Sequence, residues 1–233
     1  FKDGPALVIA GPGSGKTTVI VNRVYNLIIK HNIKPSSILV ITFTKAAAVS
    51  MKERFMSLEG SLNVPVTFGT FHAVFFTILR HAYNYSVNSI ITRDLQYNFI
   101  RDKLISFELE YSDENETVNS ILSQISKVKN DCLNIDDYIS TACPYETFRI
   151  IYKEYGKMLI SRRLIDYDDM VVLCNELLTQ RADYKAAWQD KYKYILIDEF
   201  QDINKMQFDT IKLIAGDSAN IFAVGDDDQS IYG

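Results

Sequence analysis

Short apolar runs alternate with amphipathic stretches along the first 83 residues of this 233-residue chain. Strands are predicted over residues 6–10, 38–41 and 64–68, and the first, an unbroken apolar run, is expected to be buried on both faces. Helices are predicted over residues 19–29, 45–58 and 71–83, the first with a broad apolar face and the second rich in alanine. This alternation predicts a parallel sheet with right-handed crossovers.

The pattern changes near Tyr85 and is helical as far as about Arg163, with apolar side chains at helical spacing around residues 97–107, 118–128 and 148–155. Alternation then resumes, with helices predicted over 167–178 and 205–215 and strands over 194–197 and 221–224. Asp168 and Asp169 are expected to anchor local structure. The chain is therefore predicted to be an α/β sheet domain, residues 1–84 and 164–233, with an inserted all-helical subdomain, residues 85–163.

Composition narrows the class of protein. Hydrophobic residues make up 47% and charged residues 23% of the chain, which is ordinary for a soluble globular protein. No apolar run approaches the ~20 residues that span a bilayer, and no signal peptide is evident. Cys132, Cys143 and Cys174 are widely spaced and predict reduced thiols in a cytoplasmic protein. The formal net charge of −4 argues against a uniformly basic nucleic-acid surface but allows a local positive groove.

Candidate chemistry begins directly after the first strand, in a glycine-rich turn. The segment Gly11-Pro12-Gly13-Ser14-Gly15-Lys16-Thr17-Thr18 fits the pattern G-x-x-x-x-G-K-[ST] and lies between a predicted strand and a predicted helix. Glycines let backbone N–H groups point at phosphate oxygens, and the helix N-terminus adds its positive dipole end. Lys16 would reach the β- and γ-phosphates of a nucleotide, and the Thr17 hydroxyl would bind Mg²⁺. A dinucleotide fold is disfavoured, because its G-x-G-x-x-G pattern needs glycine where Lys16 stands.

A second group of candidates follows the strand predicted at 194–197. Asp198 is suited to bind Mg²⁺ through water, and the adjacent Glu199 is suited to polarise an attacking water. An acidic turn after a strand is common on protein surfaces, so the pairing with an intact phosphate-binding turn is what favours a nucleotide hydrolase. Asp202 is also a candidate cap for the helix that follows.

The last predicted strand ends in Val224-Gly225-Asp226-Asp227-Asp228-Gln229. Three consecutive carboxylates would repel a phosphate if all of them faced it, so most are expected to point elsewhere. Gln229 is neutral and can hydrogen-bond a γ-phosphate oxygen or the attacking water. Without a recognised pattern, a solvated acidic turn would be the simpler interpretation of this segment.

Six motifs together resemble the first motor domain of the UvrD/Rep/PcrA group of superfamily 1 DNA helicases. They are GPGSGKTT (11–18), TFTKAAAVSMKER (42–54), GTFHAVFF (69–76), DYDDM (166–170), ILIDEFQD (195–202) and VGDDDQSIYG (224–233), in the family's order across essentially the whole chain. DEFQD together with GDDDQSIYG is highly specific. The resemblance implies a RecA-like P-loop NTPase core with an inserted helical subdomain. It also implies an enzyme that uses ATP and Mg²⁺ to translocate 3′ to 5′ along single-stranded DNA and to unwind duplex DNA.

The same motifs imply roles for individual residues. Phosphate contacts would come from Gly13, Gly15, Lys16, Thr17 and Thr18. Asp198 and Glu199 match the Mg²⁺ and catalytic-base positions, and Gln229 matches the residue that senses the γ-phosphate. DNA contacts would come from Phe43, Thr44 and Lys45, from Thr70, Phe71 and His72, and from Tyr232, which matches an aromatic residue that stacks on a base.

The DNA assignments are physically reasonable, because base stacking tolerates any sequence and contributes ~1–3 kcal/mol per base. Hydroxyl groups and Lys45 can contact phosphates without reading bases. Taken alone, Phe43 is more typical of a hydrophobic core and His72 of a structural histidine. The chain departs from the family pattern at Lys45, where the family usually has asparagine, and at Thr18, where it commonly has a basic residue.

A second RecA-like domain completes the ATP site in this family by supplying arginines, which can be worth ~10³–10⁵ in rate. The first half alone is therefore expected to bind nucleotide weakly, to hydrolyse it poorly and to unwind nothing. The motor of a helicase–nuclease subunit shares these motifs and remains an alternative. A nucleotide-gated DNA-binding module would be expected to lack Lys16, Asp198 or Glu199, and all three are present. Kinases and GTPases fit poorly, and the cellular pathway, DNA repair among others, stays open.

Overall fold

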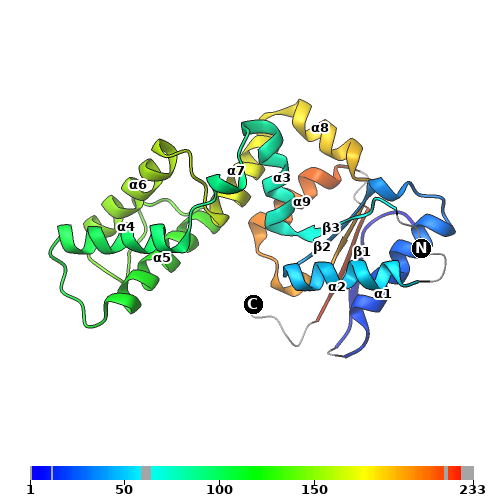
Figure 1. Cartoon of the computed structure of the whole chain (residues 1–233), viewed down its shortest axis with the longest axis horizontal. Helices are drawn as coiled ribbons and strands as arrows, with labels where there is room; N and C mark the ends of the chain where they lie inside the picture. Colours follow the sequence, from blue (N-terminus) through cyan, green and yellow to red (C-terminus); the bar gives the residue numbers. More distant parts are fainter. Residues whose placement is uncertain (1, 12, 59–63, 218–219, 227–233) are drawn as a thin grey trace. The chain divides into compact units, whose positions relative to one another are not determined.

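The computed structural model describes residues 2–11, 13–58, 64–217 and 220–226. Contacts divide the chain into two compact units, Phe1–Thr77 with Asn175–Gly233, and Ile78–Cys174. The first unit contains the sheet and the second is helical (Figure 1). Helices α3 (Phe71–Tyr83) and α7 (Tyr167–Gln180) continue across the unit boundaries. The predicted subdomain limits at residues 85 and 163 remain predictions.

Within the described residues, the sheet contains five strands in the order β1-β5-β4-β2-β3, and every neighbouring pair is parallel. The strands are β1 (Ala6–Ile9), β2 (Ile38–Thr42), β3 (Thr67–Thr70), β4 (Tyr194–Ile197) and β5 (Ile221–Gly225). The remaining elements of this unit include the helices α1 (Lys16–Ile29), α2 (Lys45–Met56), α8 (Ala182–Lys191) and α9 (Lys205–Ala215) and the short helical turns η1 (Pro35–Ser37) and η3 (Phe200–Asp202). The parallel α/β sheet predicted from the sequence is therefore confirmed.

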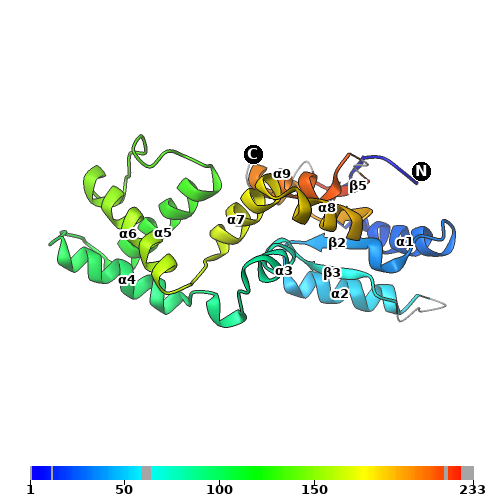
Figure 2. The ribbon, with the colours of Figure 1, turned by 90° about the horizontal axis from the view of Figure 1, so that it is seen from above.

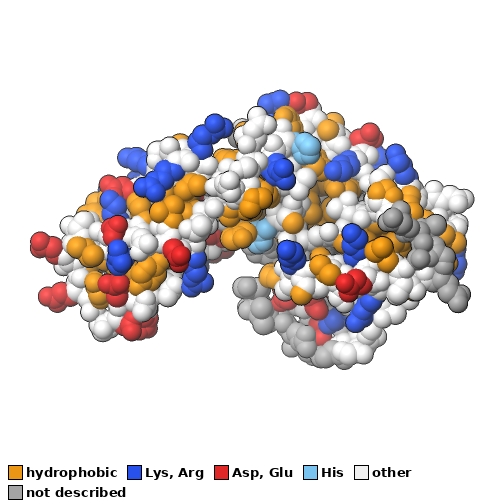
Figure 3. Space-filling model, viewed as in Figure 1, with side chains coloured by type: hydrophobic (Ala, Val, Ile, Leu, Met, Phe, Trp, Pro, Cys, Tyr) orange, Lys and Arg blue, Asp and Glu red, His pale blue; other side chains and the backbone are white. Residues whose placement is uncertain are grey.

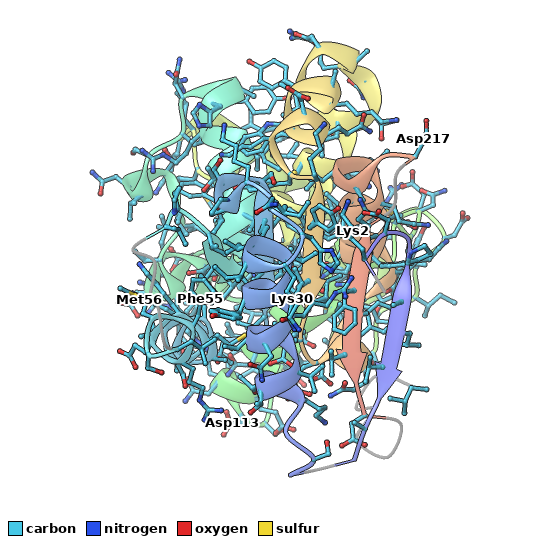
Figure 4. The ribbon with its side chains drawn as sticks, turned by 90° about the vertical axis from the view of Figure 1, so that its right-hand side faces the viewer. Lys2, Lys30, Phe55, Met56, Asp113 and Asp217 are labelled. Carbon is cyan, nitrogen blue, oxygen red and sulfur yellow. The ribbon has the colours of Figure 1, made fainter. Side chains whose placement is uncertain are left out.

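Helices cover both faces of this sheet, with α1 and α2 on one side and α8 and α9 on the other (Figure 2). Alternate strand residues point to opposite faces, so Ile38 and Val40 of β2 pack towards α1 and α2 while Leu39 and Ile41 do not join that cluster. The same core contains Val24 of α1 and Phe55 of α2, which is labelled in Figure 4. The packing of α1 against this face of the sheet and against α2 fixes the position of the helix. The N-terminus of α1 forms part of the candidate site described below.

Four predicted features of this unit differ from the structure. Strand β1 is not buried on both faces: it lies at the edge of the sheet beside β5 (Figure 4), and Leu7 and Ile9 are 54% and 57% exposed. An apolar run does not by itself distinguish a central strand from an edge strand. Strand β3 begins at Thr67 rather than at Val64, beyond Pro65, which has no N–H to donate to a sheet.

Helix α1 begins at Lys16, three residues earlier than the apolar pattern predicts, so the end of the glycine-rich turn belongs to its first turn. Helix α8 was not predicted. Its sequence, ADYKAAWQDK, has little amphipathic pattern, and Trp188 is its only side chain in the buried core. Periodicity finds helices that bury a stripe of side chains and overlooks those that bury one.

The helical unit is built on α4 (Arg93–Ser106), α5 (Glu114–Asn130) and α6 (Tyr145–Ser161), preceded by the short turn η2 (Val87–Ser89). The side chains of Thr92 and Asp113 accept hydrogen bonds from the first turns of α4 and α5 and so cap them. Acidic residues begin α5 and lysines end it, which complements the helix dipole. On the face shown in Figure 3, acidic and basic side chains are interspersed over this unit, so that face carries no uniform charge.

A buried polar cluster stabilises the helical unit. The ammonium group of Lys129, which is 10% exposed, lies 2.7 Å from Asp166 Oδ2 and 2.6 Å from Asp169 Oδ1. Burial and the neighbouring Asp166 charge raise the pKa of Asp169 to about 6. Ser126 and Asn130 both donate to Asp168 Oδ1, so the predicted structural role of Asp168 and Asp169 is confirmed. No helix in the described residues combines the length and apolarity needed to cross a membrane.

Replacing Tyr155 with phenylalanine tests this cluster. Tyr155 is 1% exposed, and its hydroxyl donates to Asp166 Oδ2 at 3.1 Å and accepts from Gln96 Nε2 at 2.7 Å. Loss of the hydroxyl leaves the Gln96 amide without this acceptor, so we expect the free energy of unfolding to fall by ~1–3 kcal/mol in denaturant titrations. Tyr83→Phe, at a tyrosine that is 44% exposed, is the control and should change stability by under ~0.5 kcal/mol. Equal effects of the two substitutions would contradict the role of the cluster.

Candidate nucleotide-binding site

The carboxyl ends of all five strands meet at one edge of the sheet, because the strands are parallel. Ile9 of β1 pairs with Gly225 of β5, and Ile197 of β4 pairs with Ala223. On the other side of β4, Ile41 of β2 pairs with Ile197. The turns after β1, β4 and β5 therefore lie together, as open parallel sheets require of a ligand site.

The glycine-rich turn after β1 leads into the N-terminus of α1. Gly13 and Gly15 have φ values of +72° and +88°, left-handed conformations that side-chain-bearing residues adopt at a cost. The N–H and the hydroxyl of Ser14 both donate to the Gly11 carbonyl and close the turn. Helix α1 has no side-chain cap and no acidic residue in its first turn. Its first N–H groups are thus available to an anion. Pro12 lies outside the described residues.

Lys16 is the point at which the strand ends meet. Its side chain is 10% exposed, and its ammonium group donates to Asp226 Oδ2 at 2.9 Å and lies 3.8 Å from Glu199 Oε2. Burial alone would lower the pKa of Lys16, but the hydrogen bond to Asp226 and the charge of Glu199 outweigh it and raise that pKa. The structure therefore brings the lysine of the phosphate-binding turn next to the acids that follow β4 and β5.

Asp198 has the properties expected of a cation ligand. It is 3% exposed, and burial together with the Glu199 charge raises the pKa of its carboxyl group to about 6. Among the described residues, its Oδ1 is buried and has no hydrogen-bond partner. A buried carboxylate oxygen without a partner destabilises the fold unless a proton or a cation binds to it. The Asp198 oxygen is therefore a suitable ligand for Mg²⁺, which prefers oxygen ligands.

Thr42, the last residue of β2, is a further candidate residue of the nucleotide-binding site, and the sequence analysis did not assign it a role. It is 1% exposed, and its hydroxyl oxygen is buried without a hydrogen-bond partner in the described structure. The backbone N–H of Asp198 donates to the carbonyl of Ile41, which places the two residues on adjacent strand ends. The described residues contain no cluster of three His, Cys, Asp or Glu side chains arranged to hold a metal, and Mg²⁺ commonly uses one or two carboxylates with substrate phosphates.

Gln201 and Asp226 form a second connection between the ends of β4 and β5. The Gln201 side chain accepts a hydrogen bond from the Asp226 N–H at 2.9 Å and donates to Glu199 Oε2 at 2.7 Å. Neither residue had been assigned a role from the sequence, although Gln201 belongs to the DEFQD motif. Asp202 does not cap α9: Asn204 does, in a reciprocal capping box with Gln207.

A groove of about 680 Å³ extends from the glycine-rich turn along α1. It starts at Ser14, Gly15 and Thr18 and reaches Lys30, the residue that follows the last residue of α1 and is labelled in Figure 4. Arg23 and Phe222 line its wall, with the guanidinium 4.5 Å from the centre of the ring. Its lining includes residues of the turn but not Lys16, Asp198 or Glu199, so the groove adjoins the candidate site without containing these three side chains.

The predicted DNA-contacting residues lie at the ends of β2 and β3, where Thr42 pairs with Thr70. Phe43 is 38% exposed and Lys45 is exposed, whereas Phe71 is 2% exposed and packs edge-on against Phe43, with ring centres 6.4 Å apart. Phe71 therefore supports the Phe43 ring from the core side. His72 is partly buried.

Thr44 and Thr70, the two predicted DNA-contacting threonines, both cap helices. Thr44 Oγ1 accepts from the Ala47 N–H and Thr70 Oγ1 from the Ala73 N–H, so each caps the helix that follows it. Neither α2 nor α3 has an acidic residue in its first turn, which leaves two positive helix ends at this edge. Gln229 and Tyr232 lie outside the described residues, and their roles stay predictions.

Comparison with known proteins identifies the class to which this arrangement belongs. Residues 1–233 match the UvrD/REP helicase N-terminal domain family. The chain is 37% identical to a putative ATP-dependent DNA helicase, YjcD, of Bacillus subtilis, over 99% of this chain and 31% of that protein. It is 36% identical to the ATP-dependent DNA helicase Rep of Buchnera aphidicola, over 100% of this chain and 35% of that protein.

A probable DNA helicase II homolog of Mycoplasma capricolum is 34% identical, over 99% of this chain and 33% of that protein. The chain thus spans about a third of the length of these relatives. It belongs to the UvrD/REP helicase N-terminal domain family, which confirms the resemblance and the RecA-like fold predicted from the motifs.

Asp198→Asn tests the electrostatics of this site. The pKa of the folded-state carboxyl is raised from 3.8 to about 6, so its contribution to stability is full below pH ~4 and is lost as the pH rises through 6. Asparagine carries no such charge, so from pH 4 to pH 7 the variant should gain ~1–2 kcal/mol in unfolding free energy relative to the unmodified chain. Urea titrations across this range measure it. The exposed Asp217→Asn is the control, and a pH-independent difference for Asp198→Asn would contradict the burial effect.

Proposed function

We propose that this chain is the ATP-binding motor half of a DNA helicase that translocates 3′ to 5′ on single-stranded DNA and unwinds duplexes. The observation that carries the proposal is the position of Lys16, 2.9 Å from Asp226 and 3.8 Å from Glu199. A cationic side chain at a helix N-terminus and carboxylates at the ends of neighbouring strands are the groups needed to bind and hydrolyse a triphosphate. The names of two relatives, a putative and an assigned ATP-dependent DNA helicase, support the ATP-driven helicase part of this proposal.

In this proposal, the glycine-rich turn, residues 11–18, holds the phosphates through its backbone N–H groups and Lys16. Thr17 and Asp198 would hold Mg²⁺, which supplies charge neutralisation at the phosphates. Glu199 would accept a proton from the attacking water, and Gln229 would contact the γ-phosphate. The buried, unpartnered Oδ1 of Asp198 supports its part of this assignment.

The DNA would lie along the ends of β2 and β3. The exposed Phe43 ring is suited to stack on a base, and Lys45 and the N-termini of α2 and α3 are suited to contact phosphates. Phe71 would act by supporting Phe43. Thr44, Thr70 and His72 would contribute from the same edge, and Tyr232 would add a second stacking surface.

The complete enzyme requires more than this part. Because the chain spans about a third of its relatives, we propose that a second RecA-like domain supplies the remaining groups of the ATP site. The proposal includes a cytoplasmic location and a boundary of the helical subdomain near residues 85 and 163. Domain closure on ATP would then move the DNA.

Lys16→Ala tests the nucleotide site in this chain. Removal of the ammonium group should weaken binding of a fluorescent ATP analogue with Mg²⁺ by ~10- to 100-fold, since charge-assisted hydrogen bonds contribute ~1.5–3 kcal/mol each. Lys52→Ala, an exposed lysine on α2, should leave the affinity unchanged. Undiminished binding by Lys16→Ala in a folded variant would defeat the assignment of the turn.

The proposed contribution of a second domain to the ATP site leads to a prediction about the rate of ATP hydrolysis. The 233-residue chain should hydrolyse ATP in the presence of single-stranded DNA at least ~10³-fold more slowly than a full-length helicase that contains it, because the arginines of the second domain are missing. Phosphate-release assays on both proteins measure this ratio. Comparable turnover would show that the site is complete within residues 1–233.

A further inference from the structure

Gln201 is the one side chain among the described residues that hydrogen-bonds both to Glu199 and to the end of β5. Its amide nitrogen donates to Glu199 Oε2 at 2.7 Å, and its amide oxygen accepts from the Asp226 N–H at 2.9 Å. A primary amide provides one donor side and one acceptor side, so these two bonds fix which atom is oxygen and which is nitrogen. The two bonds hold the amide between β4 and β5.

The backbone of Glu199 adopts an uncommon conformation. Its φ and ψ are +52° and +50°, a left-handed conformation that is costly for a residue with a side chain. Glu199 comes directly before η3, and its carbonyl accepts from the Asp202 N–H at 3.0 Å. The Glu199 carboxylate lies 3.8 Å from the Lys16 ammonium group, and Gln201 donates to the same oxygen, Oε2.

The Gln201 side chain lies close to the backbone at the end of β5. A Cβ added to Gly225 would lie 3.0 Å from Gln201 Oε1 and 3.4 Å from its backbone nitrogen. The absence of a side chain at Gly225 therefore allows the Gln201 side chain to approach the end of β5 closely. Gln201 accepts a hydrogen bond from the N–H of Asp226, and the carboxylate of Asp226 pairs with Lys16.

We infer that Gln201 is a positioning residue for hydrolysis: it orients the Glu199 carboxylate and ties it to the end of β5. One carboxylate oxygen of Glu199 accepts the hydrogen bond from Gln201, which leaves the other for the attacking water. The inference rests on the proposed role of Glu199.

The test compares Gln201→Met and Gln201→Glu in a full-length helicase that contains this chain. Methionine keeps the length of the side chain and removes both hydrogen bonds, so kcat of DNA-stimulated hydrolysis should fall by ~10- to 100-fold, as small misplacements of a reacting group do. KM and the equilibrium affinity for a fluorescent ATP analogue should stay within ~2-fold, because in the described part of the chain the hydrogen bonds of the Gln201 side chain go to Glu199 and Asp226 and not to the glycine-rich turn.

Gln201→Glu separates positioning from a structural role. It keeps an acceptor for the Asp226 N–H but sets a carboxylate against Glu199. We therefore expect a loss of kcat similar to that of Gln201→Met. A structural brace between β4 and β5 would instead be preserved by Gln201→Glu, and wild-type kcat in that variant would overturn the inference. A kcat increased in the absence of DNA, showing that Gln201 restrains Glu199, would also overturn it.

Two controls keep the outcomes distinct. Gln189→Met removes a comparable part-buried glutamine, which donates to the Leu213 carbonyl at 2.9 Å, and should leave kcat unchanged. Glu199→Gln should abolish hydrolysis. If it does and Gln201→Met retains full kcat, the inference about Gln201 fails alone. If Glu199→Gln retains hydrolysis, the proposed base fails, and the positioning role fails with it. Thermal unfolding of each variant, read beside its nucleotide affinity, confirms that the proteins compared are folded.

Discussion

The interaction on which the site depends is the ion pairing of Lys16 with carboxylates from two other strand ends. A lysine that is 10% exposed needs compensating charge, because an isolated buried ammonium group is strongly disfavoured. In this chain, the charge comes from Asp226, 2.9 Å away, and Glu199, 3.8 Å away. Residues 16, 199 and 226 thereby become neighbours although they are far apart in the sequence. The same arrangement suits a phosphate, which would supply the negative charge in place of a carboxylate.

Parallel topology makes this neighbourhood possible. Each strand delivers its following turn to one edge, and the order β1-β5-β4 sets the glycine-rich turn beside the acids of β4 and β5. The order continues through β2 and β3, so the segments assigned to DNA lie along the same edge. Thr44 and Thr70 lie at this edge of the sheet. Each caps a helix, and the cap holds a positive helix end where a nucleic-acid phosphate is proposed to lie.

The sequence predicted much of this arrangement, for identifiable reasons. The turn from Gly11 to Thr18 and the acids Asp198 and Glu199 follow apolar runs that periodicity recognises as strands, and parallel strands must end together. The edge position of β1 and the helix α8 could not be predicted, because neither sheet order nor a helix with a single buried anchor leaves a periodic signal. Asp226 was one of three consecutive acids, and only packing shows which side chain meets Lys16. Gln201 was hidden for a similar reason, since its role depends on two contacts across strands.

The most direct measurement of the central claim is the affinity of this chain for an ATP analogue with Mg²⁺ when Asp226 is replaced by asparagine. If the Asp226 carboxylate occupies Lys16 in competition with a phosphate, its neutral isostere should release the lysine. The analogue should then bind about tenfold more tightly, which corresponds to ~1.4 kcal/mol of the ~1.5–3 kcal/mol contributed by a charge-assisted hydrogen bond. Weaker or unchanged binding in the folded variant would show that Asp226 does not compete for Lys16, and would contradict the account.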